Sequence, residues 1–170
     1  KVKNEIYEDY INDSKITARP GVFRLIEELK KNNISIALVS STSEVNLLNL
    51  FTKGFNIDPY KMFDLVAHGD CTKVKKPSPE IYEWALQKLQ LPSEACIAIE
   101  DSPRGLESSN NASIKTIITP SKLTLDENFK DAKLIISNLG EPDKPFKIIS
   151  GKTYSHDYVC FDLLQMISKN

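Results

Sequence analysis

The chain has 170 residues and a formal net charge of −1, from 22 Lys and Arg against 23 Asp and Glu. This length suits one domain with a true core, and the balanced charge excludes the basic footprint of a general nucleic-acid binder. No apolar run approaches the roughly 18–20 residues that span a bilayer. Three widely spaced Cys favour reduced thiols over a disulfide framework. We therefore expect a soluble globular protein of a reducing compartment, with neither nucleic-acid nor membrane partners.

The apolar pattern predicts helices that alternate with strands. A helical stripe covers residues 1–12, a second helix begins near Val22, and the nearly all-apolar run Ile34–Val39 is typical of a strand buried on both faces. In chain order, the later expectations are a helix at 44–51, a strand at 63–66, a helix that opens at 78–80 and reaches 89, a strand at 96–99, a helix at 105–112, strands at 116–118 and 134–136, and a helix at 158–167. This rhythm favours an α/β fold with a parallel sheet.

The first candidate site follows the strand at 34–39. In an open parallel sheet, ligands bind beyond the carboxyl ends of the strands. Here the strand is followed by Ser40, Ser41, Thr42 and Ser43, whose hydroxyl and backbone N–H groups suit an anion. The same residue types are also typical helix N-caps, so both interpretations stay open.

Two further signals lie later in the chain. Lys76 is followed directly by Pro77, which suits a fixed positive charge beside a phosphate, whereas Lys73 and Lys75 are expected in solvent. The strand at 96–99 runs into Glu100 and Asp101, and two carboxylates at such a point are costly unless they meet a cation. Oxygen ligands beside a phosphate favour Mg²⁺, although Asp101 also suits a helix cap.

Along the chain, the three signals are a strand ending in Ser, then a Lys-Pro loop, then a strand ending in Glu-Asp. This order of motifs resembles that of the haloacid dehalogenase superfamily of phosphatases and phosphomutases. Residues 18–44, 75–91 and 95–119 resemble motifs of its β-phosphoglucomutase-like, CbbY-like branch. The resemblance implies a cap helix and hinge at 1–16, a partial core at 17–140 and a C-terminal extension with a helix at 141–170. That extension resembles the one in plastid and bacterial CbbY-like phosphatases.

The resemblance implies a Mg²⁺-dependent phosphatase, of which this chain is the C-terminal part. Its substrate would be a phosphorylated sugar such as xylulose 1,5-bisphosphate. Ser40 would hydrogen-bond the transferring phosphoryl group, with Ser41 and Thr42 beside it, and Lys76 would neutralise the phosphoryl oxygens. Lys3 would reach the distal phosphate of the substrate, unless it is a solvated helix lysine.

The resemblance also assigns Mg²⁺ to Asp101, with Glu100 as a further ligand or as its close neighbour. In this branch, the nucleophile and the acid/base are two aspartates in an Asp-x-Asp motif after the first strand. The present sequence contains no Asp-x-Asp. We therefore expect this chain alone to be inactive as a phosphatase.

In the family fold, the first strand lies between the strands at 34–39 and 96–99. The expected fold is thus a Rossmann-like parallel sheet that lacks this central strand and keeps a remnant of the helical cap. The absence of the central strand predicts two exposed apolar strand edges, which a missing N-terminal segment or a second copy of the chain would cover.

Three other interpretations remain. A phosphomutase like β-phosphoglucomutase would share all these motifs, and a degenerate module would bind phosphate without turnover. A nucleotide-binding domain is disfavoured, because the sequence lacks both G-x-G-x-x-G and G-x-x-x-x-G-K-[ST]. The expected location is the cytoplasm or the plastid stroma. His68 and His156 have no partner at a recognisable spacing.

Overall fold

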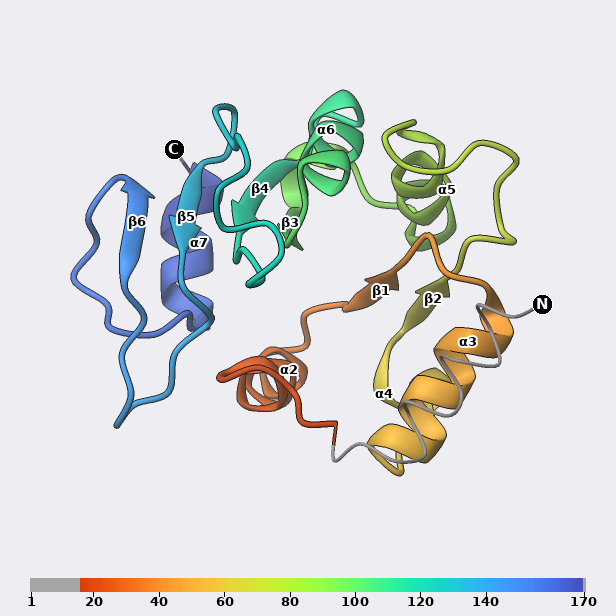
Figure 1. Cartoon of the computed structure of the whole chain (residues 1–170), viewed down its shortest axis with the longest axis horizontal. Helices are drawn as coiled ribbons and strands as arrows, with labels where there is room; N and C mark the ends of the chain where they lie inside the picture. Colours follow the sequence, from red (N-terminus) through yellow and green to blue (C-terminus); the bar gives the residue numbers. More distant parts are fainter. Residues whose placement is uncertain (1–15, 170) are drawn as a thin grey trace.

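The computed structural model describes residues 16–169, so the helix and the role of Lys3 predicted for the first residues lie outside the described part. The described chain is an α/β fold whose helices flank mostly parallel strands (Figure 1). The helices are α2 (Val22–Lys31), α3 (Glu44–Asn49), the π-helix η1 (Leu50–Gly54), α4 (Pro59–Met62), α5 (Glu80–Leu89), the 3₁₀-helix η2 (Ser93–Ala95), α6 (Pro103–Asn111) and α7 (Phe161–Lys169). The strands are β1 (Ala37–Val39), β2 (Leu65–Ala67), β3 (Ile97–Glu100), β4 (Lys115–Ile118), β5 (Leu134–Ile136) and β6 (Ile148–Gly151).

The strands form two separate sheets. β1 pairs in parallel with β2, and Ala37 lies opposite Leu65. The second sheet has the order β3-β4-β5-β6, in which β6 alone runs antiparallel to its neighbour. β1 and β3 are not paired with each other, and no described strand lies between them (Figure 1). This split confirms the expected fold class, a parallel sheet open at the position of its first strand.

Three elements differ from the sequence expectation. β1 is shorter than the run 34–39, because the N–H of Ile36 donates to Oδ2 of Asp64 at 2.8 Å instead of to a neighbouring strand. The helix after Ser43 continues beyond Phe51 as the π-helix η1. The sequence pattern does not predict β6, because its four residues, IISG, show no alternation of apolar and polar side chains, and all four are exposed in the structure.

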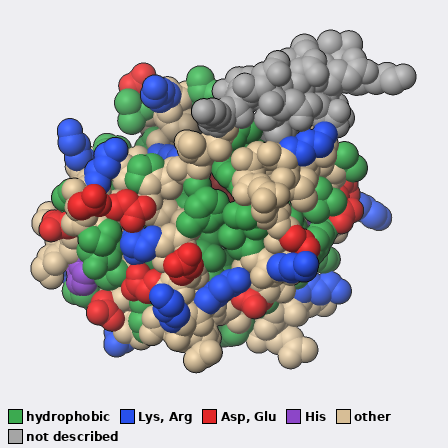
Figure 2. All heavy atoms as spheres, turned by 90° about the horizontal axis from the view of Figure 1, so that it is seen from below, with side chains coloured by type: hydrophobic (Ala, Val, Ile, Leu, Met, Phe, Trp, Pro, Cys, Tyr) green, Lys and Arg blue, Asp and Glu red, His purple; other side chains and the backbone are tan. Residues whose placement is uncertain are grey.

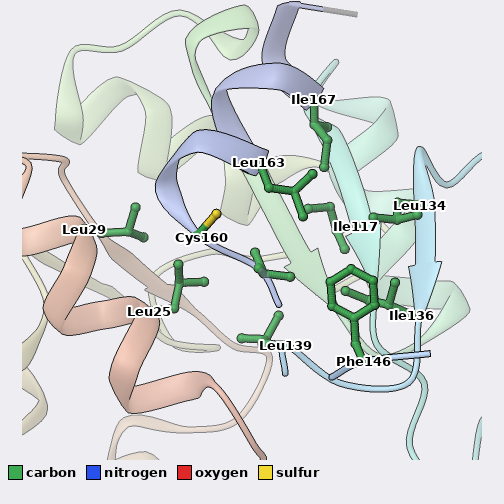
Figure 3. Packing of buried hydrophobic residues seen from close by; sticks show 11 residues of the cluster. Leu25, Leu29, Ile117, Leu134, Ile136, Leu139, Phe146, Cys160, Leu163 and Ile167 are labelled. Carbon is green, nitrogen blue, oxygen red and sulfur yellow. The ribbon is translucent and has the colours of Figure 1, made fainter. Parts of the chain in front are cut away.

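The largest hydrophobic cluster lies between the second sheet, α2 and α7 (Figure 3). Ile117, Leu134 and Ile136 of the sheet are fully buried there, together with Leu163 of α7. Leu25 of α2 closes the cluster from the other side. The residues after 140 therefore contribute to the same core as the sheet.

Charged side chains of both signs are interspersed on the face that Figure 2 shows, and hydrophobic side chains gather near its centre. Lys and Arg do not merge there into a basic patch of the kind that binds nucleic acid. Among the helices of residues 16–169, none combines the length and the apolar character needed to cross a membrane.

Candidate active site

The side chain of Lys76 joins the carboxyl ends of β1 and β3. Its Nζ donates to the carbonyl oxygen of Val39, the last residue of β1, at 3.2 Å. The same Nζ forms a hydrogen-bonded ion pair with Glu100, the last residue of β3. The strand ends of the two sheets, where the sequence predicts a ligand site, thus share one positive charge.

Of the three lysines in this loop, the structure buries one. Lys76 is 9% exposed, whereas Lys73 and Lys75 are exposed, as expected from the proline beside Lys76. Arg104 of α6 donates to the carbonyl oxygen of Lys76 at 2.6 and 3.1 Å, and the peptide bond between Lys76 and Pro77 is cis. The backbone that carries this ammonium group is therefore held from α6.

The hydroxyl residues after β1 divide between two roles. Ser43 caps α3, because its Oγ accepts a backbone N–H of the first turn at 3.5 Å. Ser40 instead continues the pairing with β2: its N–H donates to the carbonyl oxygen of Ala67 at 2.8 Å, and its Oγ accepts the N–H of Thr42 at 3.2 Å. The Oγ of Ser41 is buried and has no hydrogen-bond partner among the described residues. The capping interpretation is thus right for Ser43, and Ser40 and Ser41 remain candidates for an anion.

The loop that follows β2 holds this hydroxyl loop in place. The N–H of Gly69 donates to the carbonyl oxygen of Thr42 at 2.6 Å. A Cβ on Gly69 would lie 2.3 Å from the carbonyl oxygen of Ser41, so the close approach requires glycine. The N–H of Glu44 donates to Oδ2 of Asp70 at 2.9 Å, and this bond lowers the pKa of Asp70.

His68 has carboxylate neighbours that the sequence does not reveal. Its Nε2 lies 3.8 Å from Oε1 of Glu44, and its Nδ1 lies 3.5 Å from Oδ2 of Asp70. Glu44 precedes His68 by more than twenty residues, so their contact depends on the parallel pairing of β1 with β2.

Glu100 is enclosed by partners. Its side chain is 9% exposed, and Tyr82 of α5 donates its hydroxyl to Oε1, the oxygen that also contacts Lys76. Burial, and then the charge of Glu100, raises the pKa of Tyr82, so its hydroxyl stays protonated and remains a donor. A buried carboxylate is tolerated only with such partners. Tyr82 lies among the apolar residues of α5, so nothing in the sequence distinguishes it from a core residue.

Asp101 follows β3 directly and is exposed. Burial lowers the pKa of the nearby Arg19, and the charge of Asp101 opposes this shift. Within residues 16–169, no group of three His, Cys, Asp or Glu side chains could hold a metal ion. Mg²⁺ commonly takes one or two protein carboxylates and completes its shell with water and phosphate oxygens. The exposed Asp101 is therefore a candidate for one such carboxylate.

The fold and these strand-end residues define an α/β protein with a candidate site at the carboxyl edge of a split parallel sheet. The sequence profile of haloacid dehalogenase-like hydrolases matches residues 1–119. The chain belongs to this family, and its relatives place it in the CbbY-like branch.

One such relative is the protein CbbY of Cereibacter sphaeroides, which is 34% identical over 141 residues, 83% of this chain and 61% of the relative. Two crystal structures of CbbY from Rhodobacter sphaeroides are also similar to this chain, one in complex with phosphate and one, of a mutant, in complex with xylulose-(1,5)bisphosphate. Each has a TM-score of 0.76 at 34% identity, and the match covers 80% of this chain and 60% of the CbbY chain. The crystal structure of β-phosphoglucomutase from Clostridium difficile has a TM-score of 0.71 at 26% identity and covers 98% of this chain and 64% of its own. The chain thus spans about 60% of the CbbY proteins that it matches.

Proposed function

We propose that this chain carries the phosphate-binding residues of a Mg²⁺-dependent sugar-phosphate phosphatase, with a pentulose bisphosphate such as xylulose 1,5-bisphosphate as substrate. The observation that carries the proposal is the buried ammonium group of Lys76, which joins the ends of β1 and β3. The solved CbbY structures with phosphate and with xylulose-(1,5)bisphosphate support this choice of ligand.

In the proposed site, each residue acts by positioning or by charge, which is most of what phosphoryl transfer requires. The hydroxyl of Ser40 hydrogen-bonds a phosphoryl oxygen, with Ser41 and Thr42 of the same loop beside it. Lys76 neutralises phosphoryl charge from the ends of the two sheets. Asp101 would hold Mg²⁺, which when bound supplies further charge neutralisation for the phosphoryl group.

The proposal predicts that the chain binds phosphate without turning it over, because the sequence has no Asp-x-Asp to supply a nucleophile. Ser40→Ala should weaken the binding of inorganic phosphate about tenfold, as expected for the loss of one hydrogen bond to a charged group. Isothermal titration calorimetry measures the affinity. Ser150→Ala, which removes an exposed hydroxyl in β6, is the matched control.

The absence of phosphate binding by the unmodified chain would contradict the proposal. Turnover is measured as phosphate release from sugar phosphates in the presence of Mg²⁺. Release that is abolished by Asp101→Ala would show that the chain is active by itself and would refute the proposed inactivity.

Two alternatives have a specific observation in their favour. The similarity to β-phosphoglucomutase extends over 98% of this chain, which favours a phosphomutase. The absence of Asp-x-Asp favours a phosphate-binding module without catalysis. Addition of a CbbY-derived N-terminal segment that carries Asp-x-Asp separates the three functions: free phosphate indicates a phosphatase, an isomeric sugar phosphate a mutase, and no reaction a binding module.

We further propose that an extended segment, from the N-terminal part of the protein or from a second copy, covers the free edges of β1 and β3. Among the strands of residues 16–169, β1 and β3 each have a partner on one side only, and Ile99 of β3 is 39% exposed. Unpaired apolar strand edges tend to associate with other strands. Without an added segment, the chain is expected to self-associate through them.

A charge at the edge should block this association. Ile99→Lys should therefore shift the chain to a monomer in size-exclusion chromatography with light scattering. Leu123→Lys, at a loop position that is 92% exposed, should leave the association unchanged. Equal behaviour of the two variants would contradict the edge proposal.

A further inference from the structure

The two oxygens of the Glu100 carboxylate have different neighbours. Oε1 meets Nζ of Lys76 and the hydroxyl of Tyr82. Oε2 lies against Gly105 of α6, so closely that a Cβ added to Gly105 would come within 1.9 Å of it. Gly105 thus leaves the space that Glu100 occupies. A carboxylate enclosed in this way is a counter-ion for Lys76.

Tyr82 forms the wall of this enclosure on the α5 side. Its side chain is buried at 6% exposure, its hydroxyl oxygen lies 3.5 Å from Nζ of Lys76, and the centre of its ring lies 4.8 Å from that nitrogen. A cation beside an aromatic ring is stabilised by the ring's charge distribution. Tyr82 therefore contacts both members of the buried ion pair.

We propose that Tyr82 is a positioning residue, which acts through Glu100 to hold the ammonium group of Lys76 at the strand ends. This inference rests on the proposed function, since it assigns Lys76 to a phosphate. Val39, Glu100 and, at 3.5 Å, the hydroxyl oxygen of Tyr82 accept the three N–H groups of Lys76. The Tyr82 hydroxyl also donates to Glu100 and satisfies part of its charge, so Glu100 compensates the ammonium charge less and more of that charge acts on an anion.

The test combines Tyr82→Phe, which removes only the hydroxyl, with Glu100→Gln and the double variant, all in the 170-residue chain. Calorimetry with inorganic phosphate measures the affinity, and urea unfolding measures the unfolding equilibrium constant. Tyr158→Phe is the control, because its ring stacks on Arg24, a residue of α2 far in sequence from Lys76.

We expect Tyr82→Phe to weaken phosphate binding about fivefold and to raise the unfolding constant about tenfold, in the range of a lost hydrogen bond to a charged group. In the Glu100→Gln background, the same substitution should change the unfolding constant less than twofold, because its charged partner is gone. Tyr158→Phe should leave phosphate affinity unchanged. Should Glu100→Gln not fold, Lys76→Met serves as the second background, where phosphate affinity should no longer respond to Tyr82→Phe.

Two results overturn the inference. If Ser40→Ala weakens phosphate binding while Tyr82→Phe does not, the proposed function stands and Tyr82 has no positioning role. If the unmodified chain binds no phosphate, the proposed function fails. The unfolding measurements alone then decide whether Tyr82 acts through Glu100. A tenfold effect of Tyr82→Phe that persists in the Glu100→Gln background then shows a packing role and refutes the action through Glu100.

Discussion

Replacement of Lys76 by Met is expected to lower the free energy of unfolding by about 3 kcal/mol, because it leaves the buried Glu100 without its counter-ion. The methionine side chain keeps most of the apolar length that packs beside Tyr82, so the loss reports on charge rather than on volume. The carbonyl oxygen of Val39 loses a donor in addition. Urea unfolding followed by circular dichroism measures the change.

Two further variants sharpen this expectation. Lys75→Met, at the exposed neighbouring position, should change the free energy of unfolding by less than about 0.5 kcal/mol. The double variant Lys76→Met with Glu100→Leu should recover most of the loss, because replacing both members of a buried pair by apolar groups is often nearly neutral. Equal losses at Lys75 and Lys76 would show that the ion pair does not stabilise the fold.

Truncation of Leu163 to Ala in α7 is expected to lower the free energy of unfolding by about 3 kcal/mol, as for other large-to-small changes in a packed core. Leu163 is completely buried, and it lies beside Ile117 and Leu134 of the second sheet (Figure 3). The removed atoms would leave a cavity between the sheet and α7. Gln165→Ala, at an exposed position of the same helix, is the control.

This second prediction also concerns the C-terminal extension proposed for residues 141–170. Its last helix packs on the sheet, and the N–H of Val159 donates to the carbonyl oxygen of Leu139 at 2.7 Å. We therefore expect one cooperative unfolding transition that includes α7. An unchanged midpoint in Leu163→Ala, or a separate early transition, would show that the extension unfolds independently of the sheet.

Much of the fold follows from local patterns. The all-apolar runs predict β1, β3, β4 and β5 to within a few residues, because a short apolar run between polar turns is typical of a strand in a parallel sheet. The first residue of β1 was harder to predict from the sequence. Asp64, far from Ile36 in sequence, hydrogen-bonds both the N–H and the carbonyl oxygen of Ile36, and β1 begins only at Ala37. β6 has no buried face, so only its pairing with β5 defines it.

The candidate site also has features that the sequence predicts and features that only the tertiary structure shows. The order of Ser40, Lys76 and Asp101 along the chain predicts a site at the ends of β1 and β3, because parallel strands bring their carboxyl ends to one edge. The structure places Lys76 in contact with both strand ends, and the site itself stays a prediction. The neighbouring proline was also sufficient to distinguish Lys76 from Lys73 and Lys75. These are properties of short segments, and a sequence records them directly.

The partners of these residues depend on the tertiary structure. Tyr82 and Gly105 come from different helices and have unremarkable neighbours in sequence, yet both touch the carboxylate of Glu100. Whether a carboxylate after a buried strand meets a metal ion or a lysine is decided by what α5 and α6 place around it. The sequence by itself determined the family, the strands other than β6 and the polar residues at their ends. Only the packing of the helices decided that Glu100 is enclosed as the counter-ion of Lys76 while Asp101 remains exposed, because the cost of burying a charge depends on every group that surrounds it.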